Sequence, residues 1–331
     1  MPIRTLRDAV VVITGASSGI GRAAALAFAR RGARLALAAR REEALEEVAA
    51  QCRAEGAPQA IAVPTDVTDA QAVRRLADSV AERFGRIDVW INNAGVGAVG
   101  AFTETPVEAH DQVIRTNLLG YLHGAHAVLP HFLRRGSGVL INTISFGGWV
   151  PAPFAASYSA SKFGLRGLSD ALRAKLRRWP GIHVCDVFPS FIDTPGVQHG
   201  ANYTGRALKP APPVYAPGRV ARAMVRLAEN PRGAVTVGAV ATLARLGYAL
   251  APGLVRWTAD AFIRAYLRRA APAPVTDGNI FHPQARRDGI TGGWRSPGQR
   301  GAATAALAAA GLLGGILLLG GRGARRDRWR A

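Results

Sequence analysis

The sequence predicts an α/β fold built on one doubly wound parallel sheet. Short apolar runs alternate with longer stretches of helical spacing along most of the chain, a pattern typical of strands joined by helical crossovers. The runs are apolar at consecutive positions, which indicates strands that are buried on both faces. A glycine-rich turn follows the first run, at the place where such sheets bind nucleotides.

The expected elements follow one another in strand–helix order. Strands are expected at residues 9–14, 34–39, 59–63, 87–92, 138–145, 183–189 and 234–240. Helices are expected at 20–31, 42–56, 69–84, one or two within 106–133, 154–178 and 217–229. Because the crossovers bring the carboxyl ends of parallel strands to one edge of the sheet, a ligand site is expected along that edge.

The chain divides into four parts by composition. Residues 1–240 form the main domain, and residues 241–270 a helical extension with apolar side chains at helical intervals. Residues 271–300, rich in Pro, Gly and Arg, indicate a linker. Residues 301–331 are expected to form a transmembrane anchor with a basic tail. Within them, 302–320 carry no charge, over close to the roughly 20 residues that a bilayer-spanning helix needs.

Charge and cysteine content exclude several classes of protein. The formal net charge is +20, but the basic residues are nearly all scattered arginines, and no aromatic-interleaved basic face indicates a nucleic-acid partner. The two cysteines lie far apart, and no histidine has a partner at ligand spacing, so neither a disulfide framework nor a metal site is expected. No leader segment precedes the first strand, so the main domain is expected in the cytoplasm.

The turn after the first strand has glycines at positions suited to a nucleotide. Gly15, Gly19 and Gly21 have the spacing G-x-x-x-G-x-G between that strand and the next helix. A pyrophosphate must approach backbone N–H groups at the helix N-terminus, and a β-carbon there would block it. The residues expected to contact the cofactor here are Gly15, Ser17, Ser18, Gly19, Ile20 and Gly21.

The end of the second strand indicates which nicotinamide cofactor is bound. In NAD-binding proteins an acidic residue at this place contacts the ribose 2′-hydroxyl, whereas here Arg40 and Arg41 follow the strand. An arginine can pair with a 2′-phosphate, so NADP(H) is predicted over NAD(H), with Arg40 the first candidate and Arg41 the second. The alternative is that both are solvated surface arginines.

A tyrosine and a lysine carry the predicted acid/base chemistry. Tyr158 and Lys162 are four residues apart on an expected helix, and therefore share a face. A free tyrosine has a pKa near 10, and the nearby ammonium of Lys162 is expected to lower the pKa of Tyr158. Tyr158 could then donate a proton to a carbonyl oxygen or accept one from an alcohol.

Several motifs, in the same order along the chain, resemble the short-chain dehydrogenase/reductase family, whose members have a Rossmann fold. The matches are the glycine loop at 14–21, the segment 92–95, Ser145 thirteen residues before Tyr158, and the Y-x-x-x-K motif that Tyr158 and Lys162 form. The resemblance spans roughly residues 8–240. It implies that Lys162 also contacts the nicotinamide ribose and that Asn117 holds a water in a proton relay, and it usually goes with dimers or tetramers.

The resemblance adds further residues to the cofactor site. Ser190 departs from the family pattern, because it stands where glycine is usual. The other implied contacts are Asp66 and Val67 at the adenine, Asn93, Ala94 and Gly95 along the cleft, and Pro189 and Thr194 at the nicotinamide amide.

The substrate side of the expected site is aromatic. Ser145 is expected to hydrogen-bond the substrate oxygen and to stabilise charge that develops there. Phe146, Trp149, Phe154 and Phe191 are candidates for an apolar wall, although ordinary core packing would explain them equally well. The residues expected to contact substrate are Ser145, Phe146, Tyr158 and Phe191.

The predicted function is that of an NADP(H)-dependent oxidoreductase, an enzyme of EC 1.1.1 type. It would transfer a hydride between nicotinamide and a lipophilic carbonyl or alcohol, and its partners would be that small molecule and a lipid bilayer. Without insertion of 302–320 it would be a soluble cytoplasmic enzyme. The alternative is an NADP(H)-sensing regulatory protein on the same fold, against which the intact Ser145, Tyr158 and Lys162 argue.

Overall fold

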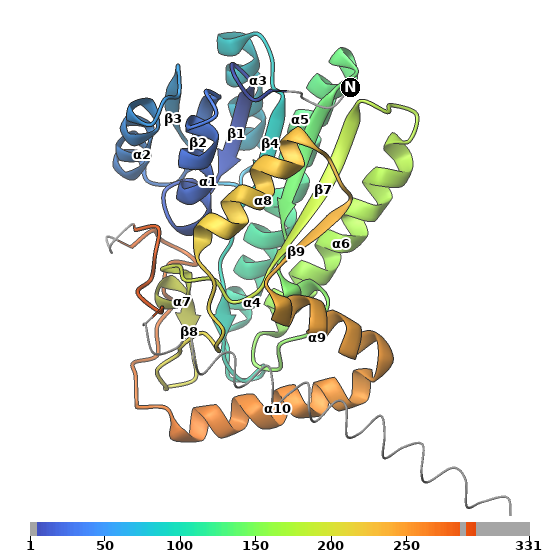
Figure 1. The fold of residues 1–331 in the computed structure, drawn as a ribbon. Coiled ribbons are helices and arrows are strands. Elements are labelled where there is room, and N and C mark those ends of the chain that lie inside the picture. Colours follow the sequence, from blue (N-terminus) through green and yellow to red (C-terminus); the bar gives the residue numbers. More distant parts are fainter. Residues whose placement is uncertain (1–4, 285–288, 296–331) are drawn as a thin grey trace, which may run out of the picture.

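A seven-stranded parallel sheet forms the centre of the molecule (Figure 1). The computed structural model describes residues 5–284 and 289–295. The strand order is β3-β2-β1-β4-β6-β7-β9, so the winding reverses between β1 and β4 and the predicted doubly wound sheet is confirmed. The strands are β1 (Val10–Thr14), β2 (Arg34–Ala39), β3 (Ala60–Pro64), β4 (Val89–Asn92), β6 (Gly138–Thr143), β7 (Ile182–Pro189) and β9 (Ala234–Val237).

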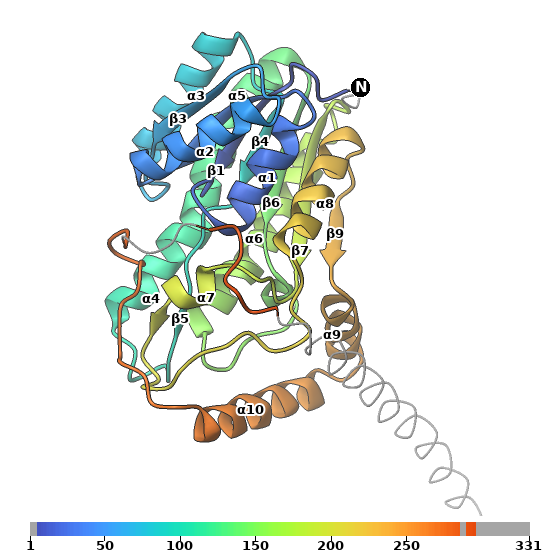
Figure 2. The ribbon, with the colours of Figure 1, turned by 60° about the vertical axis from the view of Figure 1, so that its left-hand side comes forward.

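Helices cover both faces of this sheet, as Figures 1 and 2 show. The strands alternate between two apolar layers: Val11 and Ile13 pack against α1, α2 and α8, while Val10 and Val12 pack against α3 and α5. The helices of the main domain are α1 (Gly19–Ala29), α2 (Glu42–Ala54), α3 (Ala70–Phe84), α4 (Val107–Ile114), α5 (Gly120–Arg135), α6 (Ala156–Leu176), α7 (Gly196–His199) and α8 (Pro217–Glu229).

A chain of buried polar side chains crosses one face of the sheet. Trp90 Nε1 donates to Asn92 Oδ1 (2.8 Å), and Asn92 Nδ2 donates to Asn142 Oδ1 (3.0 Å). Asn142 Nδ2 donates to Ser169 Oγ (3.1 Å), which donates in turn to Asp186 Oδ1 (2.7 Å). Because each member has a partner, the chain ties β4, β6, β7 and α6 together without leaving a buried polar group unpaired.

The region predicted as one or two helices within 106–133 contains an irregularity. A π-helical turn, η1 (Arg115–Leu119), joins α4 to α5, and π-turns of this kind are frequent at functional sites. A π-turn accommodates one residue more than an α-helical turn, and nothing in the spacing of the apolar residues marks that extra residue. The sequence therefore did not predict η1. A two-stranded sheet of β5 (Ala98–Val99) and β8 (Ala201–Asn202) was also not predicted.

The extension after the main domain is helical, as expected. It consists of α9 (Ala239–Leu250) and α10 (Pro252–Arg269), and α10 has no buried residue. In the part of the chain that the structure describes, no helix is both long and apolar enough to span a bilayer. The predicted anchor, 302–320, lies outside the described residues.

Candidate active site

The predicted site residues come from loops and helices that meet at the carboxyl edge of the sheet. The glycine loop follows β1, the segment 93–97 follows β4, and Ser145 follows β6. Tyr158 and Lys162 lie on α6, and Thr194 lies in the loop after β7. Strands on either side of the β1–β4 reversal therefore contribute, which is where doubly wound sheets bind ligands.

The glycine loop packs so closely against the loop after β4 that side chains are excluded. Gly15 has φ +65°, and a β-carbon there would lie 2.7 Å from Ala94 Cα. A β-carbon on Gly21 would collide with the Gly15 carbonyl. Asn93 fixes this contact, since its Nδ2 donates to the carbonyls of Thr14 (3.1 Å) and Gly15 (3.2 Å). The glycines are thus required by the loop itself as well as by any ligand.

The N-terminus of α1 suits the phosphates of a dinucleotide. Ser18 is the N-cap but makes no side-chain capping bond, and the first turn holds no acidic residue. The first amides of a helix have no partner within the helix, and they attract anions. Ser17, Ile20 and Gly21 lie at this end of the helix, so these residues fit a pyrophosphate.

Arg40 follows β2 as predicted but already has partners. Its Nη2 donates to the Asn279 carbonyl (2.6 Å) and its Nη1 to the Phe281 carbonyl (3.1 Å). Burial lowers the pKa of Arg40, while nearby Asp66 raises it. Arg41 is the N-cap of α2. The guanidinium of Arg40 therefore lies at the adenosine end of the expected cleft. There it is bound to the segment that contains Asn279 and Phe281, far along the chain.

The other residues expected at the adenine lie in the loop after β3. Asp66 Oδ1 accepts hydrogen bonds from the amide (2.9 Å) and the hydroxyl (2.8 Å) of Thr68. Val67 is buried, and its carbonyl hydrogen-bonds His123 Nδ1 on α5 (2.9 Å). The loop is thus held from both sides next to β2.

Ser145 is positioned by its own backbone and by the short 3₁₀ helix η2 (Phe146–Gly148). Its Oγ accepts the Gly147 amide at 3.0 Å, so its hydroxyl hydrogen can be donated to Tyr158 in the free chain or to a ligand. Its φ of +153° lies in a region that residues other than glycine rarely occupy, and such strain is often found at functional sites. A β-carbon on Gly147 would lie 3.1 Å from Tyr158 Cε1, so Ser145 and Tyr158 are neighbours.

Lys162 is buried among aromatic rings and has no carboxylate partner among the described residues. Its exposed fraction is 4%, and its Nζ donates to the Thr143 carbonyl at 3.1 Å. The same carbonyl accepts the Tyr121 hydroxyl at 2.9 Å. The ammonium lies 5.0 Å from the Tyr121 ring centre and 5.6 Å from that of Tyr158. Among the described residues, one carbonyl and weak cation–π contacts therefore compensate the charge of Lys162.

Burial sets the protonation of the pair, in contrast to the prediction. It lowers the pKa of Lys162 to about 7 and raises the pKa of Tyr158, although a hydrogen bond with Ser145 lowers it in part. The expectation that Lys162 lowers the pKa of Tyr158 is thus wrong for the free chain, because desolvation disfavours the charged form of both groups. Lys162 can lose or regain its proton near neutral pH.

Asn117 lies in the π-turn η1 and holds the segment after β4. Its Oδ1 accepts the Val96 amide and its Nδ2 donates to the Val96 carbonyl, both at 2.8 Å. A β-carbon on Gly95 would lie 3.3 Å from Asn117 Oδ1 and 4.0 Å from Lys162 Nζ. The structure therefore brings Gly95, Asn117 and Lys162 together, and the Asn117 side chain is already engaged.

The loop after β7 closes the other side of the site. Pro189 ends β7, and Thr194 lies beside the glycine loop, where a β-carbon on Gly19 would lie 3.3 Å from Thr194 Cβ. Ser190 is buried, and its Oγ has no hydrogen-bond partner in the described part of the chain. The substitution of glycine by serine thus leaves a polar atom unpaired next to the site.

The four candidate aromatic residues separate into two groups. Phe146 and Phe191 are in edge-to-face contact, with ring centres 5.1 Å apart. Trp149 packs instead on Phe188 (5.1 Å), between Arg166 and Arg245. Phe154 lies under Arg264 of α10. Of the four, Phe146 and Phe191 form an apolar pair that begins directly after Ser145, so these two stay candidates for substrate contact.

The described residues hold no group of three or more His, Cys, Asp or Glu side chains that could bind a metal. Cys52 and Cys185 are buried, and burial raises the pKa of each thiol to about 12. A thiol with so high a pKa is unreactive at neutral pH. The chemistry of the site therefore depends on the hydroxyls and the lysine.

Sequence reasoning missed several residues that shape the site. Thr14 Oγ1 accepts the amides of Asn93 (3.0 Å) and Ala94 (3.3 Å), and Tyr121 shares the Thr143 carbonyl with Lys162. The segment that binds Arg40 was also missed. It belongs to 271–300, whose composition indicates a linker, yet Ile280 in it is fully buried. The one signal in the sequence for these two residues is position: Thr14 directly precedes Gly15 of the glycine loop, and Tyr121 lies four residues after Asn117.

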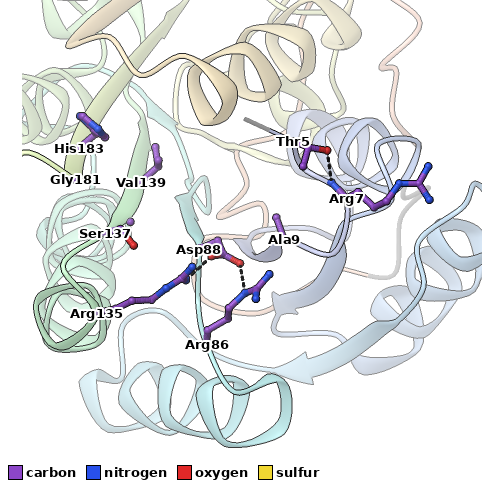
Figure 3. A pocket seen from close by; sticks show the side chains of 11 residues that line it. Thr5, Arg7, Ala9, Arg86, Asp88, Arg135, Ser137, Val139, Gly181 and His183 are labelled. Atoms are coloured by element: carbon purple, nitrogen blue, oxygen red, sulfur yellow. Dashed lines mark hydrogen bonds and ion pairs between the residues drawn. The ribbon is translucent and has the colours of Figure 1, made fainter. Parts of the chain in front are cut away.

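The cavity at the opposite, amino edge of the sheet has a different character. Figure 3 shows Asp88 between Arg86 and Arg135, with Thr5 and Arg7 at its other side. Asp88 is 5% exposed, accepts the Val10 amide (2.8 Å) and Arg86 Nε (2.9 Å), and pairs with Arg135. These charges satisfy one another, which is typical of a structural ion pair.

The fold and this site together define a dinucleotide-binding oxidoreductase. The chain belongs to the short-chain dehydrogenase family, whose model matches residues 9–202. Its members bind a nicotinamide cofactor and act on an alcohol/carbonyl pair. An uncharacterized oxidoreductase of Bacillus subtilis is 36% identical over 260 residues, which cover 77% of this chain and 72% of that protein.

Other relatives agree at the level of the family. An 11-beta-hydroxysteroid dehydrogenase A of Sesamum indicum is 38% identical over 186 residues, 56% of this chain and 53% of that protein, so this chain spans only about half of its length. The structure of an alcohol dehydrogenase from Thermococcus sibiricus, complexed with 5-hydroxy-NADP, matches with a TM-score of 0.61 and 30% identity, covering 69% of this chain and 95% of that one.

Proposed function

We propose that this chain is an NADP(H)-dependent oxidoreductase that transfers a hydride between nicotinamide and an apolar carbonyl or alcohol, with Tyr158 as the general acid/base. The observation that carries the proposal is the convergence of Ser145, Tyr158 and Lys162 at the same edge of the sheet as the glycine loop and the N-terminus of α1. A buried lysine that lies beside a tyrosine ring, and to which the described residues offer no carboxylate partner, is a costly arrangement for a purely structural site.

The roles of the side chains follow from their hydrogen bonds. In reduction, the Tyr158 hydroxyl gives its proton to the substrate oxygen. The Ser145 hydroxyl donates to the same oxygen, because Ser145 Oγ already accepts the Gly147 amide, and this bond stabilises the developing charge. When bound, the nicotinamide cofactor supplies or accepts the hydride. Lys162, once protonated, stabilises the Tyr158 phenolate and can replenish its proton.

The preference for NADP(H) rests on the arginines after β2. Arg40 and Arg41 stand where a carboxylate would contact the ribose of NAD(H). An arginine presents five N–H donors, so Arg40 can hold two carbonyls and still pair with a 2′-phosphate. Asp66 lies near enough to Arg40 to favour its charged form. The structure of a relative with an NADP analogue is consistent with this preference.

The contact of Phe146 with Phe191 supports an apolar substrate, because aromatic walls favour such ligands. The proposed reaction is tested with NADPH oxidation by the purified full-length protein across lipophilic aldehydes and ketones, with NADH in parallel. We expect turnover that prefers NADPH. Arg40→Ala and Arg41→Ala should each reduce that preference, with about a tenfold loss for the residue that binds the phosphate.

The same assay distinguishes an enzyme from an NADP(H)-sensing regulatory protein. Tight binding of NADPH without turnover of any carbonyl, and without oxidation of the corresponding alcohols, would contradict the enzyme and favour an NADP(H)-sensing regulatory protein. Equal kcat/KM with NADH and NADPH would contradict only the cofactor preference.

We also propose that the chain is held at a membrane, with the main domain on the cytoplasmic side. The support is the uncharged sequence 302–320 and the exposed Leu250 and Trp257 on α9 and α10, since exposed apolar groups of this kind often contact lipid or protein. Fractionation of cells is the test. Protein that stays with membranes in high salt and alkaline carbonate supports the proposal, and release into the supernatant contradicts it.

A homo-oligomer, which the resemblance implies, is tested by light scattering in detergent.

A further inference from the structure

The last described residues cross the carboxyl edge of the sheet. We call residues 277–284 and 289–295 the C-terminal strap. Figure 2 shows the strap, in orange to red, running along the side of α4 and then close to α7 and the start of α1. It thus lies over the edge at which the cofactor is expected.

The strap contacts all three parts of the expected cofactor cleft. At the adenosine end, Arg40 donates to the carbonyls of Asn279 and Phe281. At the glycine loop, the Gly19 amide donates to the Gly289 carbonyl at 3.1 Å. At the nicotinamide end, Trp294 Nε1 donates to the Thr194 carbonyl at 3.2 Å. In three separate places, the strap therefore contacts residues that are expected to bind the cofactor.

Buried groups hold the first segment of the strap in place. Ile280 is fully buried and packs in an apolar cluster that borders Tyr158. Its carbonyl accepts Gln112 Nε2 at 3.1 Å, and the carboxylate of Asp277 accepts the Tyr203 hydroxyl at 2.6 Å. Because burial of an isoleucine side chain removes a large apolar area from water, this segment is firmly attached.

The second segment is held by one carboxylate oxygen. Asp193 is 4% exposed, and its Oδ1 accepts the amides of Gly292 (3.0 Å) and Trp294 (2.9 Å). Gln198 Nε2 donates to the Gly292 carbonyl at 3.0 Å. Because charge-assisted bonds to backbone amides are strong, Asp193 determines where this segment lies.

Apart from the Gly19 amide, which donates to the Gly289 carbonyl, the bonds to the strap use atoms that a cofactor does not need. Thr194 is bound through its backbone carbonyl, so its hydroxyl is left for the nicotinamide amide. Arg40 is bound at one hydrogen of each Nη, which leaves three of its five N–H donors. Once the Gly19 amide exchanges the Gly289 carbonyl for a phosphate oxygen, the strap and a bound dinucleotide can be present together, with the strap on the outside.

On the basis of the function proposed above, we propose that the C-terminal strap is the outer wall of the cofactor site, and that Asp193 is the positioning residue that holds it closed. The cofactor leaves only when the strap opens. Loosening the strap should therefore speed the release of NADPH and weaken its binding, without impairing the proton transfer at Tyr158.

Gly292 offers a way to displace the strap without changing the catalytic groups. A β-carbon at Gly292 would collide with the Thr194 carbonyl, so Gly292→Val must push the segment outward. The neighbouring Gly293 is the matched control: nothing lies within 4 Å of a β-carbon there, and Asn tolerates its φ of +77°. Gly293→Asn should behave as wild type.

A second pair of variants tests Asp193 itself. Asp193→Ala removes the oxygen that accepts both amides, whereas Asp193→Asn keeps an Oδ1 at that position. Asp193→Asn should therefore keep NADPH release and binding close to wild type, whereas Asp193→Ala should not. A role of Asp193 in folding alone would alter the melting temperature without altering cofactor release.

The experiment measures the dissociation of NADPH from the full-length variants by its fluorescence in stopped flow, together with Kd and kcat at saturating NADPH. Gly292→Val and Asp193→Ala should each raise the dissociation rate and the Kd by roughly tenfold, while kcat is not lowered. Unchanged release, or tighter binding in these variants, would overturn the strap proposal while leaving the enzyme intact. A wild-type protein that binds no nicotinamide cofactor would overturn the proposed function and the strap with it.

Discussion

Two buried charges lie at opposite edges of the sheet, and their surroundings differ. Asp88, at the amino edge, accepts a backbone amide and pairs with two arginines. Lys162, at the carboxyl edge, donates to one carbonyl and has no carboxylate partner in the described part of the chain. A charge that has all its partners within the protein stabilises the fold, whereas a charge that lacks them is available to a ligand.

The largest expected effect concerns the group beside the uncompensated lysine. Tyr158→Phe should lower kcat/KM by about 10²–10⁴-fold, because it removes the acid/base while keeping the ring. Tyr266→Phe is the matched control, since Tyr266 lies on α10 and donates its hydroxyl to the Ala207 carbonyl (2.7 Å). Steady-state kinetics with the best carbonyl substrate measures both, and a Tyr158→Phe enzyme within threefold of wild type would contradict the assignment.

At the other edge, removal of the charge should affect stability and not chemistry. Asp88→Ala leaves the buried Val10 amide without its acceptor and separates Arg86 and Arg135 from their partner. We expect a loss of about 2–3 kcal/mol in the free energy of unfolding, less than for a fully dry pair because both arginines reach solvent. Urea unfolding measures it. A change in kcat at a temperature where the variant is folded would speak against a purely structural role.

A smaller effect is expected within the buried polar chain. Ser169→Ala removes the bond to Asp186 and leaves Asn142 Nδ2 without an acceptor. Arg173 still pairs with Asp186, so the expected loss of stability is about 1–2 kcal/mol. Thermal unfolding followed by circular dichroism is the measurement. Full stability in the variant would show that the chain of hydrogen bonds contributes less than its burial suggests.

Much of the fold and the grouping of the candidate site residues could be predicted from the sequence, because the signals are local. The glycines after β1 and the spacing of Tyr158 and Lys162 each report on a single turn or helix face, and the confirmed parallel sheet follows from consecutive apolar residues. The strap could not be predicted, since the groups that it offers to Arg40, Gly19 and Asp193 are backbone carbonyls and amides, which have no side-chain signature. The lowered pKa of Lys162 could not be predicted from the sequence either, because it depends on how deeply the folded chain buries the side chain.

The comparison of the two charges is tested most directly with Lys162→Met. The pKa of Lys162 is about 7 in the folded chain and 10.5 when unperturbed, so the unfolded chain binds more protons between these values. The free energy of unfolding therefore rises with pH across this window, and burial of the lysine costs stability most at and below pH 7. Methionine fills the same space without a charge.

The measurement is urea unfolding of wild type and Lys162→Met at pH 7 and pH 9, with activity recorded on the same samples. We predict a variant that is inactive yet more stable at pH 7, by on the order of 1–3 kcal/mol, with a smaller gain at pH 9. A variant that is less stable than wild type at pH 7 would contradict the account, because Lys162 would then be a structural charge like Asp88.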